Sequence, residues 1–409
     1  MTDVRARPGV QVARVLYVWD GTYPWDVRTE KICRSLSENG MDVMILARNA
    51  GDQPTEDRLP EGRVVRTRPW SWVGRKIDRL STFPAFLNPR WLAHIASGVR
   101  RHRPDVIIVR DLPLAPTALW VGRVFGVPVV FDMAEHYAAM IEGVWRTGRQ
   151  GRWDFLVRNP KAIAAVERYV LPRVDHTITV IEESSARVAA LGVPPERVTV
   201  VSNTPPAARA ATAPAVKLPS STLVMTYLGL MEAPRGIIEV LDAMAILLRE
   251  GRPVELRLIG GGRDLPLFRE HAASLGLAEP EVRFLGQVPN REALQEVALA
   301  DVGLVPHHAD DSWNNTIPNK LFDYMAAGLP VVTSSAAPAA RIVREAKCGV
   351  VYRSQDAKDL ARQVVPLFDA IVRAGMSDAG RAAVRNEHNW ERDTSRLLSA
   401  LDHAIQRTA

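Results

Sequence analysis

The sequence predicts an α/β protein of two Rossmann-like domains, each built on a parallel sheet, and three observations support this fold class. The chain has 409 residues, more than one hydrophobic core organises, so two domains of roughly 200 residues are expected. Short β-branched runs alternate with amphipathic helical stretches, as in parallel α/β proteins. This alternation is interrupted once, by a Pro- and Ala-rich segment, and then resumes.

The first half opens with a strand at Val12 to Val18, followed by a helix at Arg28 to Asn39 whose apolar spacing ends at Gly40. Short apolar runs then predict five more strands, at Val43 to Ala47, Val106 to Val109, Val129 to Phe131, Thr177 to Val180 and Val198 to Val201. The second and third of these runs are apolar without alternation, as expected of strands that are buried on both faces.

A linker is predicted at Thr204 to Pro219, which contains almost no large apolar residue. The pattern then restarts, with strands and helices at Thr222 to Leu228, Gly236 to Glu250, Val254 to Ile259, Asp264 to Leu275, Val282 to Leu285, Val302 to Val305 and Val331 to Thr333. A last amphipathic stretch covers Trp390 to Arg407. We therefore expect domains at residues 1–203 and 220–385, a linker at 204–219 and a closing helical segment at 386–409.

Composition narrows the functional classes. Lys and Arg number 52 against 46 Asp and Glu, a net charge of +6, which favours anionic partners such as nucleotide diphosphates or anionic lipids. We expect no nucleic-acid partner, because no zinc knuckle, basic zipper or RNA-recognition motif is present. Cys33 and Cys348 have no second cysteine or histidine at zinc-ligand spacing, so no metal site is expected. Two distant thiols, no signal peptide and no run of ~20 apolar residues predict a cytoplasmic protein.

In parallel sheets, ligands bind beyond the carboxyl ends of the strands, and with two domains we expect the site in the cleft between them. One candidate is the turn after Ile259, where Gly261 and Gly262 allow close approach of a phosphate or base and Arg263 adds a positive charge. The alternative is a tight turn into the next helix. Leu265 replaces the last glycine of the fingerprint G-x-G-x-x-G, so NAD binding is not expected.

The segment Asn314 to Val332 is more informative, because Pro318 and Gly328 bracket a helix that precedes a buried strand. Its loop and first helical turns gather four polar residues, Asn315, Asn319, Lys320 and Asp323. Free N–H groups and a lysine at a helix start suit a diphosphate, and the carboxylate of Asp323 suits a ribose diol. The alternative is a solvated ion pair between Lys320 and Asp323.

Residues Asn319 to Thr333, N-K-L-F-D-Y-M-A-A-G-L-P-V-V-T, resemble the donor-binding signature of retaining glycosyltransferases with the GT-B fold, glycosyltransferase family 4. This family includes glycogen synthases and phosphatidylinositol mannosyltransferases. It carries two glutamates separated by seven residues, and here Asp323 stands at the second position and Asn315 at the first. The resemblance implies that Asp323 binds the ribose and that the donor site also includes Asn315, Thr316, Ile317 and Asn319.

The resemblance implies retaining transfer of a hexose-type sugar from a nucleoside diphosphate sugar to a hydroxyl of a glycolipid, polysaccharide or natural product. No covalent nucleophile, metal or cofactor beyond the nucleotide sugar is expected. Two segments, Tyr227 to Gly229 and Ala233 to Gly236, resemble the family's basic loop, with Arg235 in the usual lysine position and Leu230 in place of a second basic residue. Lys320 and Arg235 would then stabilise the leaving phosphate, and Lys320 with Arg263 would replace the charge missing at position 230.

The first domain is implied to bind the acceptor, and the closing segment is implied to return to it. After the first strand, Gly21 would let the donor approach closely, while Arg28 would steady this loop or bind the acceptor. The alternative is that Arg28 is only part of an amphipathic helix.

After the strand ending at Phe131, relatives carry D-x-H-E, whereas this chain reads D-M-A-E-H from Asp132 to His136. Glu135 is therefore the first candidate for an acid–base residue and His136 the second, with Asp132 orienting the loop. The alternative for His136 is a packing or surface role.

The stretch Arg63 to Arg103 is dense in basic and tryptophan side chains, namely Arg66, Arg68, Trp70, Trp72, Arg75, Lys76, Arg79, Trp91, Arg100, Arg101 and Arg103. Such side chains suit a bilayer surface, so peripheral contact with an anionic membrane, at the inner face of the cell membrane, is one expectation. The other is an acceptor-side insertion with solvated charges.

Two rival functions remain open at this point. The substitutions Ala134, Leu230 and Asn315 are compatible with a catalytically inactive partner subunit that binds a sugar nucleotide. A GT-B epimerase, which would alter the nucleotide sugar without an acceptor, is the other rival.

Overall fold

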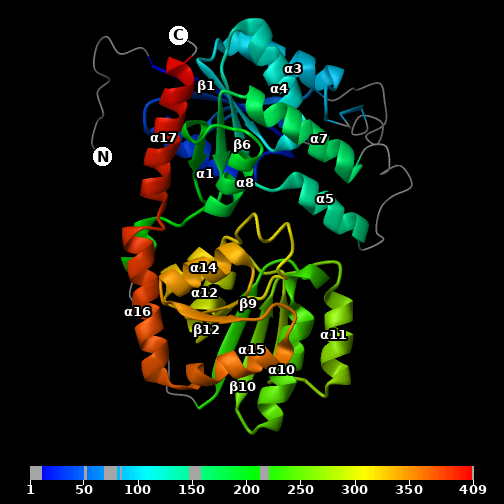
Figure 1. Cartoon of the computed structure of the whole chain (residues 1–409), viewed down its shortest axis with the longest axis vertical. Helices are drawn as coiled ribbons and strands as arrows, with labels where there is room; N and C mark the ends of the chain where they lie inside the picture. Colours follow the sequence, from blue (N-terminus) through cyan, green and yellow to red (C-terminus); the bar gives the residue numbers. More distant parts are fainter. Residues whose placement is uncertain are drawn as a thin grey trace. The chain divides into compact units, whose positions relative to one another are not determined.

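The computed structural model describes residues 12–49, 53–68, 81–82, 85–146, 158–211 and 221–407 (Figure 1). The chain divides into two compact units, Met1–Val201 with Thr394–Ala409, and Ser202–Asp393. Each unit contains a sheet of mainly parallel strands with helices packed on it, so the predicted fold class is confirmed.

The sheet of the first unit has the strand order β3-β4-β2-β1-β5-β6-β7-β8. Its strands are β1 Arg14–Thr22, β2 Asp42–Arg48, β3 Glu56–Leu59, β4 Gly62–Arg66, β5 Val106–Arg110, β6 Val129–Met133, β7 His176–Thr179 and β8 Val198–Val200. Only β3 pairs antiparallel, with β4, and the other pairs are parallel. β6 is wholly buried, β5 is buried from Val106 to Val109 and β1 from Val15 to Val18, which explains the unbroken apolar runs in these strands.

The longer helices of the first unit are α1 Val27–Glu38, α3 Pro89–His102, α4 Ala115–Phe125, α5 Tyr137–Arg146, α7 Pro160–Val170 and α8 Glu182–Ala190. Trp91 on α3 is fully buried in the core, and buried Arg66 donates hydrogen bonds to the backbone oxygens of Tyr23 and Pro54. These two side chains therefore cannot contact a bilayer, which corrects that part of the membrane expectation. Five others from the same stretch, Trp70, Trp72, Arg75, Lys76 and Arg79, lie outside the described residues.

The sheet of the second unit is wholly parallel, in the order β11-β10-β9-β12-β13-β14. Its strands are β9 Leu223–Leu228, β10 Val254–Ile259, β11 Val282–Gly286, β12 Val302–Val305, β13 Val331–Ser334 and β14 Gly349–Tyr352. Its helices are α9 Ala207–Ala211, α10 Ile237–Arg249, α11 Leu265–Ser274, α12 Asn290–Leu299, α13 Lys320–Ala327, α14 Ala337–Glu345, α15 Ala357–Val364 and α16 Ala370–Asn386.

Two features near the ends of the second unit differ from a plain linker and tail. The segment predicted as a linker contains helix α9, which packs against α13 and α16 although it is only five residues long. The last helix, α17 Trp390–Gln406, starts in the second unit, and its part from Thr394 onward belongs to the first.

Candidate functional site

The strand orders identify where each sheet is open to a ligand. In the second unit the order reverses between β9 and β12, and in the first unit between β1 and β5. At such a switch point the loops after the two strands diverge, which leaves room for a ligand beyond their carboxyl ends. The residues that follow these four strands are therefore the candidates for the site.

In the second unit, Lys320 at the start of α13 is buried, with 9% of its surface exposed. Its Nζ lies 3.9 Å from the centroid of the Tyr227 ring and has no hydrogen-bond partner among the described residues. Burial lowers the pKa of Lys320 well below its ordinary value of 10.5, and the charge of Arg235 lowers it further. Gly229 makes room for this side chain, because a Cβ there would lie 2.7 Å from Nζ, at a φ of +147°.

Arg235 brings a second positive charge to the same place. Its Nη1 lies 3.2 Å from Nε2 of His307, and its guanidinium stacks on Trp313, 4.8 Å from the ring centroid. Its ion-pair partner among the described residues, Glu232, lies 4.0 Å away, from Nη2 to Oε2. His307 is fully buried beside the same tryptophan, with ring centroids 4.2 Å apart. Two cations with so little acidic compensation form a site suited to a multiply charged anion.

The glycine turn has a clear packing function. The turn after β10 is hydrogen-bonded to the loop after β9, since Met231 N donates to Gly261 O over 3.0 Å. A Cβ on Gly262 would lie 2.4 Å from Met231 O, whereas the nearest atoms to one on Gly261 are 3.9 Å away. Arg263 is largely exposed and lies 3.5 Å from the carboxylate of Asp264. The turn thus lies beside the loop of Gly229, but no contact joins Arg263 to Lys320 or Arg235.

The structure separates the two charged residues of α13 that the sequence placed on one face. Asp323 accepts a hydrogen bond from Arg209 on α9, with Nη1 2.6 Å from Oδ1, while Lys320 is buried and unpaired. The alternative of a solvated Lys320–Asp323 ion pair is therefore wrong. In the loop before α13, Asn315 donates from Nδ2 to Asp311 O over 2.8 Å. Thr316 is half-buried, Ile317 is buried and Asn319 is exposed at the N-cap position.

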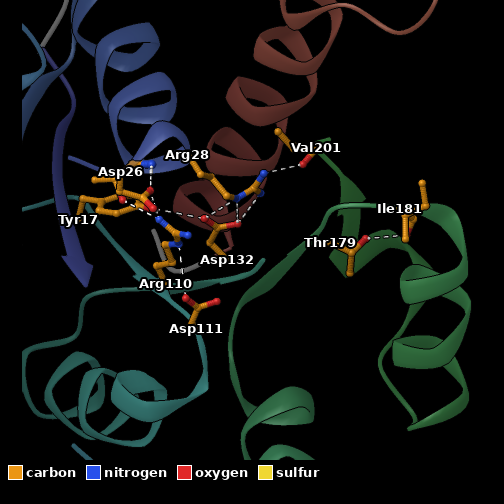
Figure 2. Close-up of polar contacts among 10 residues, drawn as sticks. Tyr17, Asp26, Arg28, Arg110, Asp111, Asp132, Thr179, Ile181 and Val201 are labelled. Carbon is orange, nitrogen blue, oxygen red and sulfur yellow. Dashed lines mark hydrogen bonds and ion pairs between the residues drawn. The ribbon is translucent and has the colours of Figure 1, made fainter. Parts of the chain in front are cut away.

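In the first unit, Arg28 and Asp132 form a buried ion pair (Figure 2). Arg28 donates from Nε to both Asp132 oxygens over 3.0 Å and from Nη1 to Val201 O over 3.1 Å, and the Tyr17 hydroxyl donates to Asp132 over 3.2 Å. This network ties α1, β1, β6 and the end of the sheet together. Both charged side chains are buried, and the contacts of Arg28 lie within this network.

Arg110 and Asp111, directly after β5, form a second polar group (Figure 2). Arg110 bonds the carboxylate of Asp26, donates to Thr29 Oγ1 over 3.0 Å, and lies 4.9 Å over the Trp19 ring. Its Nε is 3.4 Å from Asp111 Oδ2.

Asp111 itself has a φ of +61°, unusual for a residue with a Cβ. Its Oδ1 is buried without a hydrogen-bond partner among the described residues, and burial raises the pKa of Asp111 to about 7, although the side chain is 22% exposed. Strain and a perturbed carboxyl at a switch point are typical of functional positions. Asp111 was not among the site residues predicted from the sequence, although Asp111, like Asp132, follows a predicted buried strand.

The other predicted site residues of the first unit, Glu135, His136 and Gly21, have different surroundings. Glu135 is exposed and close enough for its charge to raise the pKa of Asp111. His136 instead lies with Nε2 3.9 Å from Glu167, which forms an ion pair of 2.8 Å with Arg187. Gly21 is covered by Trp19, because a Cβ on Gly21 would lie 2.2 Å from that ring.

The described parts of the chain contain neither a metal-binding cluster nor a helix that could span a membrane. No group of three or more His, Cys, Asp or Glu side chains is placed to hold a metal ion. No helix there combines the length and apolarity needed to cross a membrane.

Two family models match most of the chain. A family model described as a glycosyl transferase 4-like domain matches residues 26–204, and one described as glycosyl transferases group 1 matches residues 222–370. The chain is 26% identical over 402 residues to the D-inositol 3-phosphate glycosyltransferase of Thermobispora bispora, covering 92% of this chain and 89% of that protein.

Two solved structures share the fold. Sucrose-phosphate synthase from Thermosynechococcus elongatus has a TM-score of 0.75 at 16% identity, covering 97% of this chain and all of that one (100%). Anabaena HepE in complex with UDP has a TM-score of 0.70 at 14% identity, covering 95% of this chain and 99% of that one.

Proposed function

The chain belongs to the family 4 glycosyltransferases of the GT-B fold, which use nucleotide-sugar donors, and we propose that it transfers a hexose-type sugar with retention of configuration and without a metal ion. The observation that carries this proposal is that two cations, Lys320 against Tyr227 and Arg235 against His307 and Trp313, lie at the β9–β12 switch point. Two cations with one distant carboxylate supply fixed positive charge where a metal would otherwise neutralise a leaving diphosphate.

On the donor side, we assign the diphosphate to Lys320, Arg235 and the loop of Gly229, which approaches Lys320 closely. The ribose diol is assigned to Asp323, which lies one turn into α13. Asn315, Thr316, Ile317 and Asn319 complete the proposed donor site, and Gly261, Gly262 and Arg263 flank it. No cofactor beyond the nucleotide sugar is required.

On the acceptor side, we assign the contact with the acceptor hydroxyl to Asp111 and Glu135. Asp111 has an unpaired carboxylate oxygen at the β1–β5 switch point, and Glu135 is exposed nearby. Arg28 and Asp132 are positioning residues. In the proposed reaction the leaving phosphate oxygen accepts the proton of the acceptor hydroxyl, which attacks on the face that the diphosphate leaves. The D-inositol 3-phosphate glycosyltransferase relative makes phosphorylated polyols the first acceptors to test, ahead of glycolipids, polysaccharides and natural products.

The test begins with thermal shifts of the wild type and Lys320→Ala in UDP, GDP, ADP, CMP and dTDP, with and without EDTA. At ~100 times Kd a ligand adds about 2.7 kcal/mol of stability, a shift of several degrees. We expect a shift with one nucleotide that EDTA leaves unchanged and the variant loses. Transfer from the matching nucleotide sugar is then followed by NMR of the anomeric proton. An inverted product contradicts the retaining mechanism, and an EDTA-sensitive rate contradicts metal independence.

A further inference from the structure

His307, on the segment directly after β12, has two ring nitrogens in different situations. Nε2 faces a guanidinium nitrogen of Arg235 at 3.2 Å. A guanidinium only donates hydrogen bonds, so Nε2 must be the accepting, unprotonated nitrogen. In the neutral ring the proton therefore lies on Nδ1, and this N–H is a donor.

The Nδ1–H of His307 is buried, and it has no hydrogen-bond partner among the described residues. The ring stays neutral because burial and the nearby charges of Lys320, Arg235 and His308 all lower its pKa, well below 6.5. An unsatisfied buried donor costs roughly 1–3 kcal/mol, so its retention calls for a ligand or a water that accepts from it.

The surroundings identify the chemistry of that acceptor. The other unpaired donor of this site is the Nζ of Lys320, and both groups adjoin Arg235. Trp313 packs against the imidazole and the guanidinium together, and its backbone N–H donates to Asp310 Oδ1 over 2.9 Å, which fixes its loop. The Tyr227 ring lies 3.9 Å from Lys320 Nζ and 6.5 Å from the His307 ring, centroid to centroid, so a cationic and a neutral donor lie around one aromatic ring. Such a pair of donors suits an anion with several oxygens.

We propose that His307 is a phosphate-contacting residue of the donor site, with Nδ1–H donating to an oxygen of the diphosphate while Nε2 holds Arg235 in place. This inference rests on the proposed function and adds a residue and a protonation state to it. The donation is made by the neutral imidazole, so the contact does not switch off as pH rises from 6 to 8.

Substitutions of His307 can distinguish the role of Nδ1 from that of Nε2. In His307→Gln the amide oxygen reaches the place of Nε2 and keeps the acceptor for Arg235, but no donor remains at the place of Nδ1. His307→Phe keeps the ring against Trp313 and removes both nitrogens. His308→Gln is the matched control, because the Nε2 of His308 bonds Oε1 of Glu239 over 2.9 Å and not Arg235.

The experiment is titration calorimetry of inorganic pyrophosphate and UDP into folded protein, with folding checked by circular dichroism. We expect His307→Gln to raise the Kd of pyrophosphate about tenfold, the cost of one hydrogen bond to a charged group, and His307→Phe to raise it further. The ratio of variant to wild-type Kd should be the same at pH 6 and pH 8, and His308→Gln should bind like the wild type.

Wild-type affinity in His307→Gln would overturn the inference while leaving the proposed function standing, provided Lys320→Ala still loses binding. A Kd ratio that shrinks steadily from pH 6 to pH 8 would also overturn it, since that result requires an imidazolium. If the wild type binds neither pyrophosphate nor any nucleotide of the panel, the proposed function fails and this inference fails with it.

Discussion

Replacing Lys320 by methionine should stabilise the protein without ligand and abolish its response to nucleotide. The lysine is nine-tenths buried, and its ammonium contacts the Tyr227 ring without a hydrogen-bond partner among the described residues. Methionine has a similar length, fills the same space and carries no group that must be desolvated. The substitution therefore removes a penalty that the wild type tolerates for the sake of binding.

The magnitude follows from two opposing terms. Removing a buried unsatisfied donor gains about 1–3 kcal/mol, and losing the cation–π contact costs about 0.5–2 kcal/mol. The expected net gain is about 1 kcal/mol, which raises the melting temperature of a domain of this size by about 2–4 °C. In the presence of nucleotide at ~100 times Kd the order reverses, because only the wild type gains the further 2.7 kcal/mol.

The assay is differential scanning calorimetry of both proteins with and without the nucleotide selected by the thermal-shift panel. Lys358→Met, at an exposed position on α15, is the control, with an expected change within about 0.5 kcal/mol and an intact ligand response. A melting temperature of Lys320→Met several degrees below the wild type would refute the reasoning, since it would mean that the ammonium is well satisfied. A preserved nucleotide shift would refute the assignment of the lysine to the diphosphate.

Three further predictions follow from buried charges. Arg28→Met should lower the free energy of unfolding in urea by about 3–5 kcal/mol, because it leaves Asp132 buried and unpaired. Arg209→Met breaks an exposed ion pair and should cost under ~1 kcal/mol. Equal costs for the two variants would contradict this prediction. The free energy of unfolding of Asp111→Asn, relative to the wild type, should increase as pH rises from 4 to 8. The pKa of Asp111 is about 7 in the folded protein against an ordinary 3.8, so ionisation destabilises the folded wild type over this range and the asparagine avoids that loss. A difference that does not change with pH would count against this prediction. The nucleotide affinity of the wild type should fall as pH rises toward 10.5, because the lowered pKa of Lys320 means that its ammonium is lost below that pH. The affinity of Lys320→Arg should not change over the same range. A constant wild-type affinity, measured by calorimetry, would exclude Lys320 as a ligand of the diphosphate.

Elements that depend only on local sequence patterns could be predicted. Buried parallel strands are continuous apolar runs, so β1, β5, β6 and β9 could be placed from the sequence, and Gly328 ends α13 as expected. The strands β3 and β4 were missed because each is short and mixes charged with apolar residues, which leaves no long apolar run. The closing helix was recognised by its apolar spacing alone.

The candidate site was predicted only in part, because its geometry depends on long-range contacts. Lys320 and Arg235 were selected from their motifs, but the histidine and tryptophan that hold Arg235 come from a loop about 70 residues away along the chain, which no local pattern connects. Arg28 and Asp132, separated by 104 positions, were both noticed, yet their mutual burial could not be seen. Asp111 could have been found, since the rule about strand ends applies to it directly.

The division of α17 between the two units has a consequence for how this chain is made. The second unit is one continuous stretch, whereas the first needs residues from both ends of the chain, including the pairing of the His176 and His403 rings, 5.5 Å apart. During synthesis the second unit can therefore complete itself while the first still lacks its last helix. Until the residues after Thr394 have been made, β7 lacks the His403 ring that lies beside His176, so the first unit can be completed only after the second.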